Sequence, residues 1–215
     1  MSAKVKICGI TNKDDATWAI NYGADYIGVN FYKESPRHVS VATAVKWLPS
    51  LPPFVPVIGV FVDETNETIL KAVDHLNLKG VQLHGNESAE QVAALKNELA
   101  GQGRSVMIIK AFRIADESNL APIADYLPHV DHLLLDSRVE GQMGGTGERF
   151  SWDLAVKAKD MGKTIFLAGG LTPDNVKEAV KKVSPYAVDV ASGVEKSPKR
   201  KDLDKMKNFI TTAKK

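Results

Sequence analysis

Seven polar side chains lie between apolar residues near the ends of short apolar runs. They are Lys6, Cys8, Asn30, Gln82, His84, Asp136 and Asp189. Side chains with thiol, imidazole, carboxyl, amide and ammonium groups bind polar ligands or transfer protons. One such residue alone is usually hydrogen-bonded within the protein interior. Seven such residues are harder to supply with hydrogen-bond partners inside the protein, and a buried polar group without a partner is unfavourable. We therefore expect them to share a cavity that holds water or a ligand.

Elements that can position these residues alternate along the whole chain. Apolar runs predict strands at 5–10, 26–31, 56–62, 80–84, 106–112, 132–136, 164–170 and 187–193. Amphipathic segments predict helices at 13–22, 41–48, 66–76, 87–100, 117–126, 152–160, 173–182 and 201–213. Alternating strands and helices indicate a parallel sheet, and eight such pairs fit a closed (β/α)8 TIM barrel. A doubly wound open sheet is the alternative. No linker rich in Gly, Ser or Pro interrupts the pattern, so we expect one domain over residues 1–215.

A barrel of this kind carries its chemistry at the C-terminal ends of its strands. Side chains of a strand alternate between the barrel interior and the helix layer. The apolar residues Val5 and Ile7 should face the helices, which turns Lys6 and Cys8 inward. The same alternation turns the other five polar residues inward. All seven should therefore meet at one mouth.

Two glycine-containing loops predict a phosphate site. Gly169–Gly170 follow the seventh expected strand and precede a helix with Thr172 as its N-cap and Pro173 at its first position. Ser192–Gly193 end the eighth expected strand. Glycine lets backbone N–H groups approach an anion, and helix N-termini favour negative charge. The loops after strands seven and eight commonly bind phosphate in these barrels. We infer a phosphorylated small-molecule ligand.

Composition argues against several classes of partner. The net charge is +2 in 215 residues, too small to indicate nucleic acid, and the basic segment 196–202 is expected to be a solvated loop. A single cysteine rules out an internal disulfide framework and suits a reducing compartment. No secretory leader and no run of about 20 apolar residues is present. We expect a soluble cytoplasmic protein, monomeric or homodimeric, that binds neither nucleic acid nor membrane.

Several sequence motifs occur from end to end of the chain. They are KICGIT (6–11), GADYIGVNFYKESPRHVS (23–40), GVFVDE (59–64), VQLHGNE (81–87), LLLDS (133–137), GGTGERFSW (144–152), FLAGGLTPDNV (166–176) and VDVASGVE (188–195). In this order and spacing they resemble those of phosphoribosylanthranilate isomerases, and the resemblance is specific. Two departures are small: Ala191 stands where the family often has Ser, and His38 where Tyr is common. Ala191 leaves the phosphate loop one hydroxyl short.

The resemblance implies an Amadori rearrangement that needs one acid and one base. It makes Asp136 the general acid, which protonates the ribose ring oxygen, and Cys8 the general base, which removes the C2′ hydrogen of the resulting imine. No metal or organic cofactor is expected, because the imine is itself the electron sink. A thiol has a pKa of about 8.5, so the base role requires surroundings that favour the thiolate. Lys6 can provide them, or it can pair with Asp189.

The resemblance also assigns the remaining site residues. Arg37 becomes the partner of the anthranilate carboxylate, for which a planar guanidinium is well suited. His84 and Gln82 are expected to shape the mouth, and Asp189 either binds the sugar or neutralises Lys6. The glycine-rich segment 144–147 is interpreted as a cover over the site.

Two other classes of protein fit parts of the pattern: another sugar-phosphate enzyme of these barrels, and a non-catalytic phosphosugar-binding barrel. Metal-dependent sugar-phosphate epimerases share the phosphate loops, but they need metal-binding His and Asp residues at several strand ends, and only His84 is a plausible inward histidine. The histidine-pathway aminoaldose isomerase normally has an Asp where this chain has Cys8. A non-catalytic phosphosugar-binding barrel would not need a complete acid–base pair.

Overall fold

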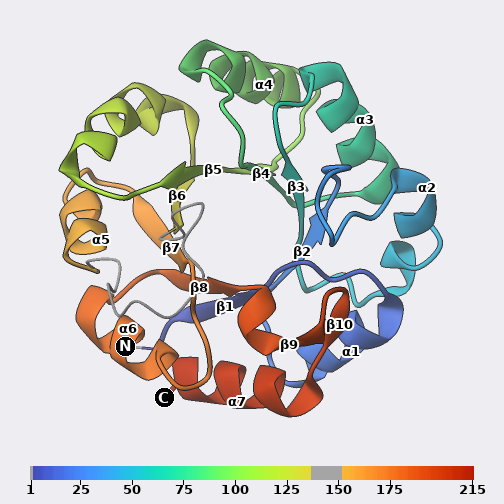
Figure 1. Cartoon of the computed structure of the whole chain (residues 1–215). Helices are drawn as coiled ribbons and strands as arrows, with labels where there is room; N and C mark the ends of the chain where they lie inside the picture. Colours follow the sequence, from blue (N-terminus) through green and yellow to red (C-terminus); the bar gives the residue numbers. More distant parts are fainter. Residues whose placement is uncertain (1, 137–151) are drawn as a thin grey trace.

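The computed structural model describes residues 2–136 and 152–215, which contain a closed barrel of parallel strands (Figure 1). In chain order the strands are β1 (Lys4–Ile7), β2 (Tyr26–Asn30), β3 (Val57–Phe61), β4 (Gly80–Leu83), β5 (Met107–Arg113), β6 (His132–Asp136), β7 (Thr164–Ala168) and β8 (Ala187–Val190). Neighbours in sequence are neighbours in the barrel, and β1 also pairs with β8, with Lys6 opposite Asp189. This closure confirms the predicted TIM barrel and rules out the open sheet.

Helices surround the strands (Figure 1). They are α1 (Lys13–Asn21), α2 (Val41–Ala44), α3 (Asn66–Leu76), α4 (Ala89–Gly101), α5 (Trp152–Lys159), α6 (Val176–Val183) and α7 (Leu203–Ala213). Five of them begin after a polar N-cap whose side chain accepts a backbone N–H bond: Asn12, Ser40, Thr65, Ser88 and Asp202. Such caps satisfy N–H groups that have no partner within the helix, and they define where each helix starts.

Two predicted helices are wrong in length or type, and prolines explain both. The segment 41–48 is helical only to Ala44 and is followed by the 3-10 helix η1 (Leu48–Ser50). Pro49 has no N–H to donate to the carbonyl of Val45, a bond that would continue the α-helix through this segment. The predicted helix 117–126 is replaced by two 3-10 helices, η2 (Glu117–Asn119) and η3 (Ala121–His129). Pro122 and Pro128 remove N–H donors that an α-helix needs there.

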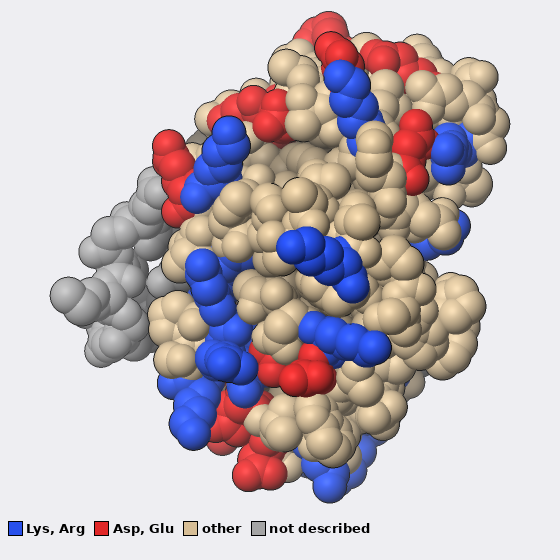
Figure 2. Space-filling model, turned by 90° about the vertical axis from the view of Figure 1, so that its right-hand side faces the viewer, with Lys and Arg blue, Asp and Glu red and all other residues tan. Residues whose placement is uncertain are grey.

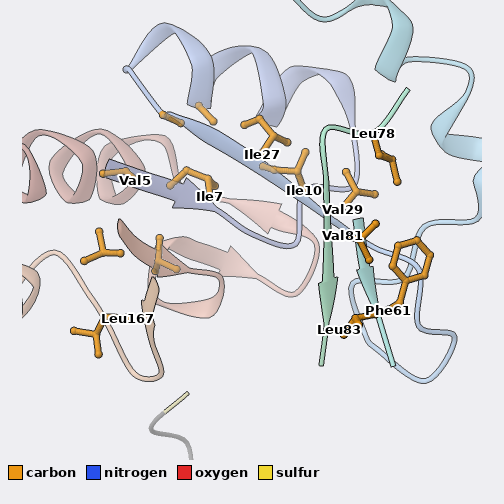
Figure 3. Close-up of a cluster of buried hydrophobic side chains, with 14 of the residues drawn as sticks. Val5, Ile7, Ile10, Ile27, Val29, Phe61, Leu78, Val81, Leu83 and Leu167 are labelled. Atoms are coloured by element: carbon orange, nitrogen blue, oxygen red, sulfur yellow. The ribbon is translucent and has the colours of Figure 1, made fainter. Parts of the chain in front are cut away.

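Two apolar layers follow the predicted alternation along the strands. The outer layer packs strand residues such as Val5, Ile7 and Ile27 against the helices (Figure 3). The inner layer fills the barrel and contains Tyr26, Ile58, Ile109, Ala111, Leu134, Phe166, Ala168 and Ala187. The inward positions of β6 pass from Leu134 to Asp136, and those of β8 pass from Ala187 to Asp189. Polar side chains therefore lie at the C-terminal end of the barrel, above an apolar floor.

A short hairpin follows β8 and leads into α7. The 3-10 helix η4 (Ser192–Val194) is followed by β9 (Glu195–Ser197) and β10 (Arg200–Lys201), which pair antiparallel. Basic and acidic side chains are interspersed over the face of the molecule in Figure 2, in keeping with the small net charge of +2. In the part of the chain that the structure describes, no helix has the length and apolar character needed to cross a membrane.

Candidate active site

Lys6 is fully buried in the barrel and binds partners from two other strands. Its Nζ donates to Asp189 Oδ1 at 2.9 Å and to Gln82 Oε1 at 2.8 Å. Burial lowers the pKa of the Lys6 ammonium, but the charges and hydrogen bonds of Asp189 and Cys8 more than offset this effect, so the pKa is raised. Lys6 therefore carries its charge inside the barrel. Of the two expected roles for Asp189, its position fits the neutralisation of Lys6.

Cys8 lies directly after β1, where its backbone N–H donates to the Val190 carbonyl at 2.8 Å. Its thiol is buried and is not part of a disulfide. Gly28 of β2 makes room for it, because a Cβ at Gly28 would lie 2.9 Å from Cys8 Sγ and 3.1 Å from Lys6 Cε. A glycine at this inward position therefore lets the thiol and the ammonium chain share the interior.

Burial dominates the ionisation of Cys8. It raises the pKa of the thiol, the Lys6 ammonium lowers it, and the Asp189 carboxylate raises it again. The balance leaves the pKa above its ordinary value. The surroundings of Cys8 thus do not favour the thiolate in the free protein. Lys6 acts in the expected direction, but it is bound to Asp189 and does not outweigh burial.

Lys201 is a second cation near Cys8, and the sequence analysis missed it. Its Nζ is buried and donates to the carbonyls of Cys8 at 2.7 Å and Ala191 at 3.0 Å. It also lies 3.3 Å from Glu195 Oε1. The expectation that segment 196–202 is solvated is therefore wrong for Lys201, although Lys196 and its neighbours up to residue 200 are exposed. Residues 196–200 are all exposed, so no local pattern in the basic run distinguishes Lys201 from its neighbours.

Replacing Lys201 with methionine is expected to move the ionisation of the Cys8 thiol to higher pH. The Lys201 ammonium lowers the pKa of the Cys8 thiol, so its removal leaves less thiolate. The pH dependence of thiol alkylation measures this directly, because Cys8 is the only cysteine. Lys196→Met, an exposed change in the same hairpin, is the matched control. An alkylation profile identical in the two variants would contradict the expected influence of Lys201.

A series of polar contacts leads from Lys6 to the acid candidate. Gln82 Nε2 lies 2.7 Å from His84 Nδ1, and His84 Nε2 lies 3.5 Å from Asp136 Oδ2. Gln82 is buried, whereas His84 and Asp136 are partly exposed at the end of the barrel. The alternation along β4 and β6 brings these side chains together as predicted. Asn30 behaves differently, because its Oδ1 accepts the N–H of Tyr32 and so shapes its own loop.

Arg37 lies across the backbone after β1. A Cβ at Gly9 would collide with the Arg37 side chain, so the glycine permits this close approach. Arg37 Nε and Nη2 donate to the two carboxylate oxygens of Glu195 at 2.7 and 2.6 Å. This bidentate pair raises the pKa of the guanidinium. It uses one edge of the guanidinium group, and the Nη1–Nη2 edge can bind a second carboxylate.

The glycine loops after β7 and β8 are packed together. Gly169 and Gly170 have φ values of 86° and 62°, a region that favours glycine. A Cβ at Gly193 would collide with the carbonyl oxygen of Leu171 in the neighbouring loop. At Gly170, in contrast, an added Cβ would meet open space. The two loops therefore form one unit at the C-terminal end of the barrel.

Asn175 holds the first of these loops, and this corrects the predicted helix 173–182. Its Oδ1 accepts the Thr172 N–H at 2.8 Å, and its Nδ2 donates to the Gly170 carbonyl at 3.0 Å. The helix α6 starts at Val176 after Asn175, so Thr172 is not its N-cap. Thr172 Oγ1 instead accepts the Asp174 N–H at 3.3 Å within the turn. The side chain of Asn175 thus competes with the helix for the preceding backbone.

The candidate residues follow one another around the rim in the order of the strands. Asp136 ends β6, the two glycine loops follow β7 and β8, Cys8 follows β1, and Arg37 follows β2. The expected cover at 144–147 lies outside the described residues. Within residues 2–136 and 152–215, no cluster of three or more His, Cys, Asp or Glu side chains has the arrangement of a metal site.

The fold and the position of these residues define a (β/α)8 barrel that carries its candidate acid, base and anion-binding loops at the C-terminal face. A family model described as N-(5'phosphoribosyl)anthranilate (PRA) isomerase matches residues 5–212, and the chain belongs to this family.

Relatives and solved structures agree over almost the whole chain. The N-(5'-phosphoribosyl)anthranilate isomerase of Trichlorobacter lovleyi is 46% identical over 98% of this chain and 98% of its own length. The crystal structure of the phosphoribosyl anthranilate isomerase from Thermotoga maritima has a TM-score of 0.88, with 40% identity over 99% of this chain and 98% of that one. A crystal structure of a phosphoribosyl anthranilate isomerase in complex with reduced 1-(o-carboxyphenylamino)-1-deoxyribulose 5-phosphate has a TM-score of 0.85, with 39% identity over 99% of this chain and 98% of that one.

Proposed function

We propose that Cys8, Asp136 and Arg37 carry out in this chain the reaction of its family, the isomerisation of N-(5'-phosphoribosyl)anthranilate. Membership of the family makes the chain an isomerase of tryptophan biosynthesis. The observation that supports the residue assignment is their order around one rim, with an acid and a base on either side of two anion-binding loops.

Asp136 begins the reaction as the acid. It gives its proton to the ribose ring oxygen, the bond from this oxygen to C1′ breaks, and the nitrogen lone pair forms a cationic imine with C1′. The Cys8 thiolate then takes the proton from C2′, and the electrons of the C–H bond move into the imine to give an enolamine. Tautomerisation of the enolamine gives the amino ketone. Every step includes a proton transfer, so the reaction needs a positioned acid and base.

The imine explains how a buried thiol serves as the base. Burial raises the pKa of Cys8 in the free protein. A nearby cation favours the charged form of a thiol, and the imine places a positive charge next to the hydrogen that Cys8 removes. Lys6 and Lys201 act in the same direction. We infer that the thiol gives its proton to solvent water in the mouth as the imine forms, after Asp136 has acted, and the resulting thiolate is the base.

The substrate spans the rim from β7 to β2. Its phosphate lies at the loops that contain Gly169, Gly170, Ser192 and Gly193, where open space borders Gly170. Its anthranilate carboxylate lies at the Nη1–Nη2 edge of Arg37, because Glu195 occupies the other edge. This orientation brings the sugar carbon atoms between Cys8 and Asp136.

Exchange of Arg37 for methionine is expected to weaken substrate binding by roughly 10- to 150-fold, since a hydrogen bond to a charged group contributes about 1.5–3 kcal/mol. The inhibition constant for inorganic phosphate should change little, because phosphate competes at the other end of the site. Gly170→Asn should instead weaken inhibition by inorganic phosphate together with substrate binding. Asparagine tolerates a positive φ, and its side chain would enter the open space beside the loop.

The control for the glycine change is Gly103→Asn, at a residue that also has a positive φ and open space but lies in the connection from α4 to β5. We compare inhibition constants for phosphate with KM values for the substrate, because the two together distinguish effects at the phosphate end of the site from effects at the carboxylate end. If Arg37→Met weakens phosphate inhibition as strongly as substrate binding, the proposed orientation is inverted.

One assay tests the function directly. Purified protein is mixed with freshly made phosphoribosylanthranilate, and loss of the anthranilate fluorescence is followed. We expect turnover that a strong chelator leaves unchanged, because the proposed steps need only protons. Binding without turnover would indicate a phosphosugar-binding barrel. Loss of activity on chelation, with recovery on addition of a divalent ion, would indicate a metal-dependent epimerase.

The remaining expectations are also part of this proposal. Residues 1–215 act as one catalytic domain, and Gln82, His84 and Asp189 support the mouth around the substrate. The partner is a phosphorylated small molecule, as in the solved complex of a relative. The dimeric enzyme of Thermotoga maritima has also been solved as engineered monomers, and we expect this chain to be a monomer or a homodimer. The single cysteine suits the reducing conditions of the cytoplasm.

A further inference from the structure

We propose that Lys6 and Gln82 hold His84 as the neutral imidazole with its proton on Nε2, and that His84 in this form positions Asp136 as an acid. Gln82 and His84 are then positioning residues for the isomerisation rather than general lining of the mouth. The inference rests on the proposed role of Asp136, and it is carried by the direction of two consecutive hydrogen bonds and by the contact of His84 with Asp136.

The first bond fixes the amide of Gln82. An ammonium group has three donors and no acceptor, so the atom of Gln82 that lies 2.8 Å from Lys6 Nζ must be the carbonyl oxygen. A flipped amide would place its NH2 group against the ammonium. Lys6 and Gln82 are both buried, and two donors that face each other there could form no hydrogen bond between them. Asp189 holds Lys6 in place from the neighbouring strand β8 at 2.9 Å.

The second bond fixes the imidazole. With its oxygen directed at Lys6, Gln82 presents its NH2 group to His84 Nδ1 at 2.7 Å. A donor at this distance requires a lone pair on Nδ1. The imidazolium form carries a proton on both nitrogens and would place two donors face to face. The neutral ring with its proton on Nε2 is the form that satisfies both partners.

The third contact connects the ring to the acid. The Nε2 proton is directed at Asp136 Oδ2, 3.5 Å away, and such contacts often shorten when substrate binds. An imidazolium here would form an ion pair that holds Asp136 as a carboxylate. A neutral N–H orients the carboxyl group without this full positive charge. Asp136 can then carry the proton that it gives to the ring oxygen.

Nitrogen NMR of the histidine side chains tests the tautomer without reference to activity. The chain has five histidines, and the signals lost in His84→Asn identify those of His84. We expect an unprotonated Nδ1 and a protonated Nε2 at neutral pH in the unmodified protein. A proton on Nδ1, alone or together with one on Nε2, would overturn the inference.

Two near-isosteric changes at Gln82 test the consequence. Gln82→Glu keeps an acceptor for Lys6 but replaces the NH2 donor with an acceptor for His84 Nδ1. It should convert His84 to the imidazolium form and lower kcat by about 10²-fold, the lower end of the contribution of an acid, with a smaller change in KM. Gln82→Met has no hydrogen-bonding amide and adds no charge. It should leave His84 with mixed tautomers and a kcat between those of Gln82→Glu and the unmodified protein.

The two variants also separate this inference from the proposed function. The positioning role would be contradicted if the NMR signals of His84 were the same in Gln82→Glu as in the unmodified protein. It would also be contradicted if Gln82→Glu and Gln82→Met had equal kcat values. Full activity in Asp136→Asn would contradict the proposed acid, whatever the tautomer of His84. If a Gln82 variant does not fold, the spectrum of the unmodified protein still decides the tautomer.

Discussion

Replacement of Cys8 by alanine is expected to lower kcat by about 10²–10⁴-fold, the usual contribution of a positioned proton transfer. Alanine cannot take the C2′ proton of the imine, but it fits the space beside Gly28 that the thiol occupies. KM should change much less, because the phosphate and carboxylate contacts lie elsewhere on the rim. Steady-state kinetics with freshly made substrate provide the measurement.

A pH profile refines this expectation. Burial raises the pKa of the Cys8 thiol, so the thiolate fraction of the free protein grows as the pH rises. The ratio kcat/KM should therefore increase on the alkaline side of neutrality, and this rise should be absent from the residual activity of Cys8→Ala. A near-normal kcat in Cys8→Ala, with chemistry still rate-limiting, would show that the thiol is structural.

Replacement of Asp136 by asparagine is also expected to lower kcat by about 10²–10⁴-fold. The amide has nearly the same shape as the carboxyl group, and its oxygen can still accept the His84 N–H bond. It cannot protonate the ribose ring oxygen, so the ring stays closed. The imine on which Cys8 acts is then not formed.

Ligand binding serves as the control for Asp136→Asn. Reduced 1-(o-carboxyphenylamino)-1-deoxyribulose 5-phosphate is the ligand in the complex of a relative, and its ring is already open. Its affinity for the variant should stay within a few-fold of that for the unmodified protein, because an open-chain ligand needs no proton from Asp136 in order to bind. A large loss of affinity together with the loss of kcat would assign Asp136 to binding.

The barrel was predictable because its signals are local. Alternation in runs such as VKICGI sets which side chains face inward, and the structure confirms this for Lys6, Gln82 and Asp189. The glycine loops were found for the same reason, since φ values of 86° and 62° at Gly169 and Gly170 are typical of glycine. Periodicity and glycine placement act over a few residues, and the sequence displays both directly.

Contacts between distant segments could not be predicted in this way. Lys201 belongs to a basic run, and its burial depends on carbonyl groups of Cys8 and Ala191 that the fold brings to it. The bidentate pair of Arg37 with Glu195 joins residues 158 positions apart. The pKa of Cys8 is set by a balance of burial and several charges, so even its direction required the three-dimensional arrangement.

The pairing of β1 with β8 also has a consequence for the synthesis of the chain. Lys6 and Asp189 are separated by 183 positions, and a ribosome adds about 5–20 residues per second. Lys6 therefore waits roughly 10 to 40 seconds for its counter-ion at that rate. Until then, enclosing its ammonium group would leave a charge uncompensated in the interior, which is strongly unfavourable. We expect the nascent strands to remain open until β8 has emerged, so that the ion pair beneath the mouth delays closure of an incomplete barrel.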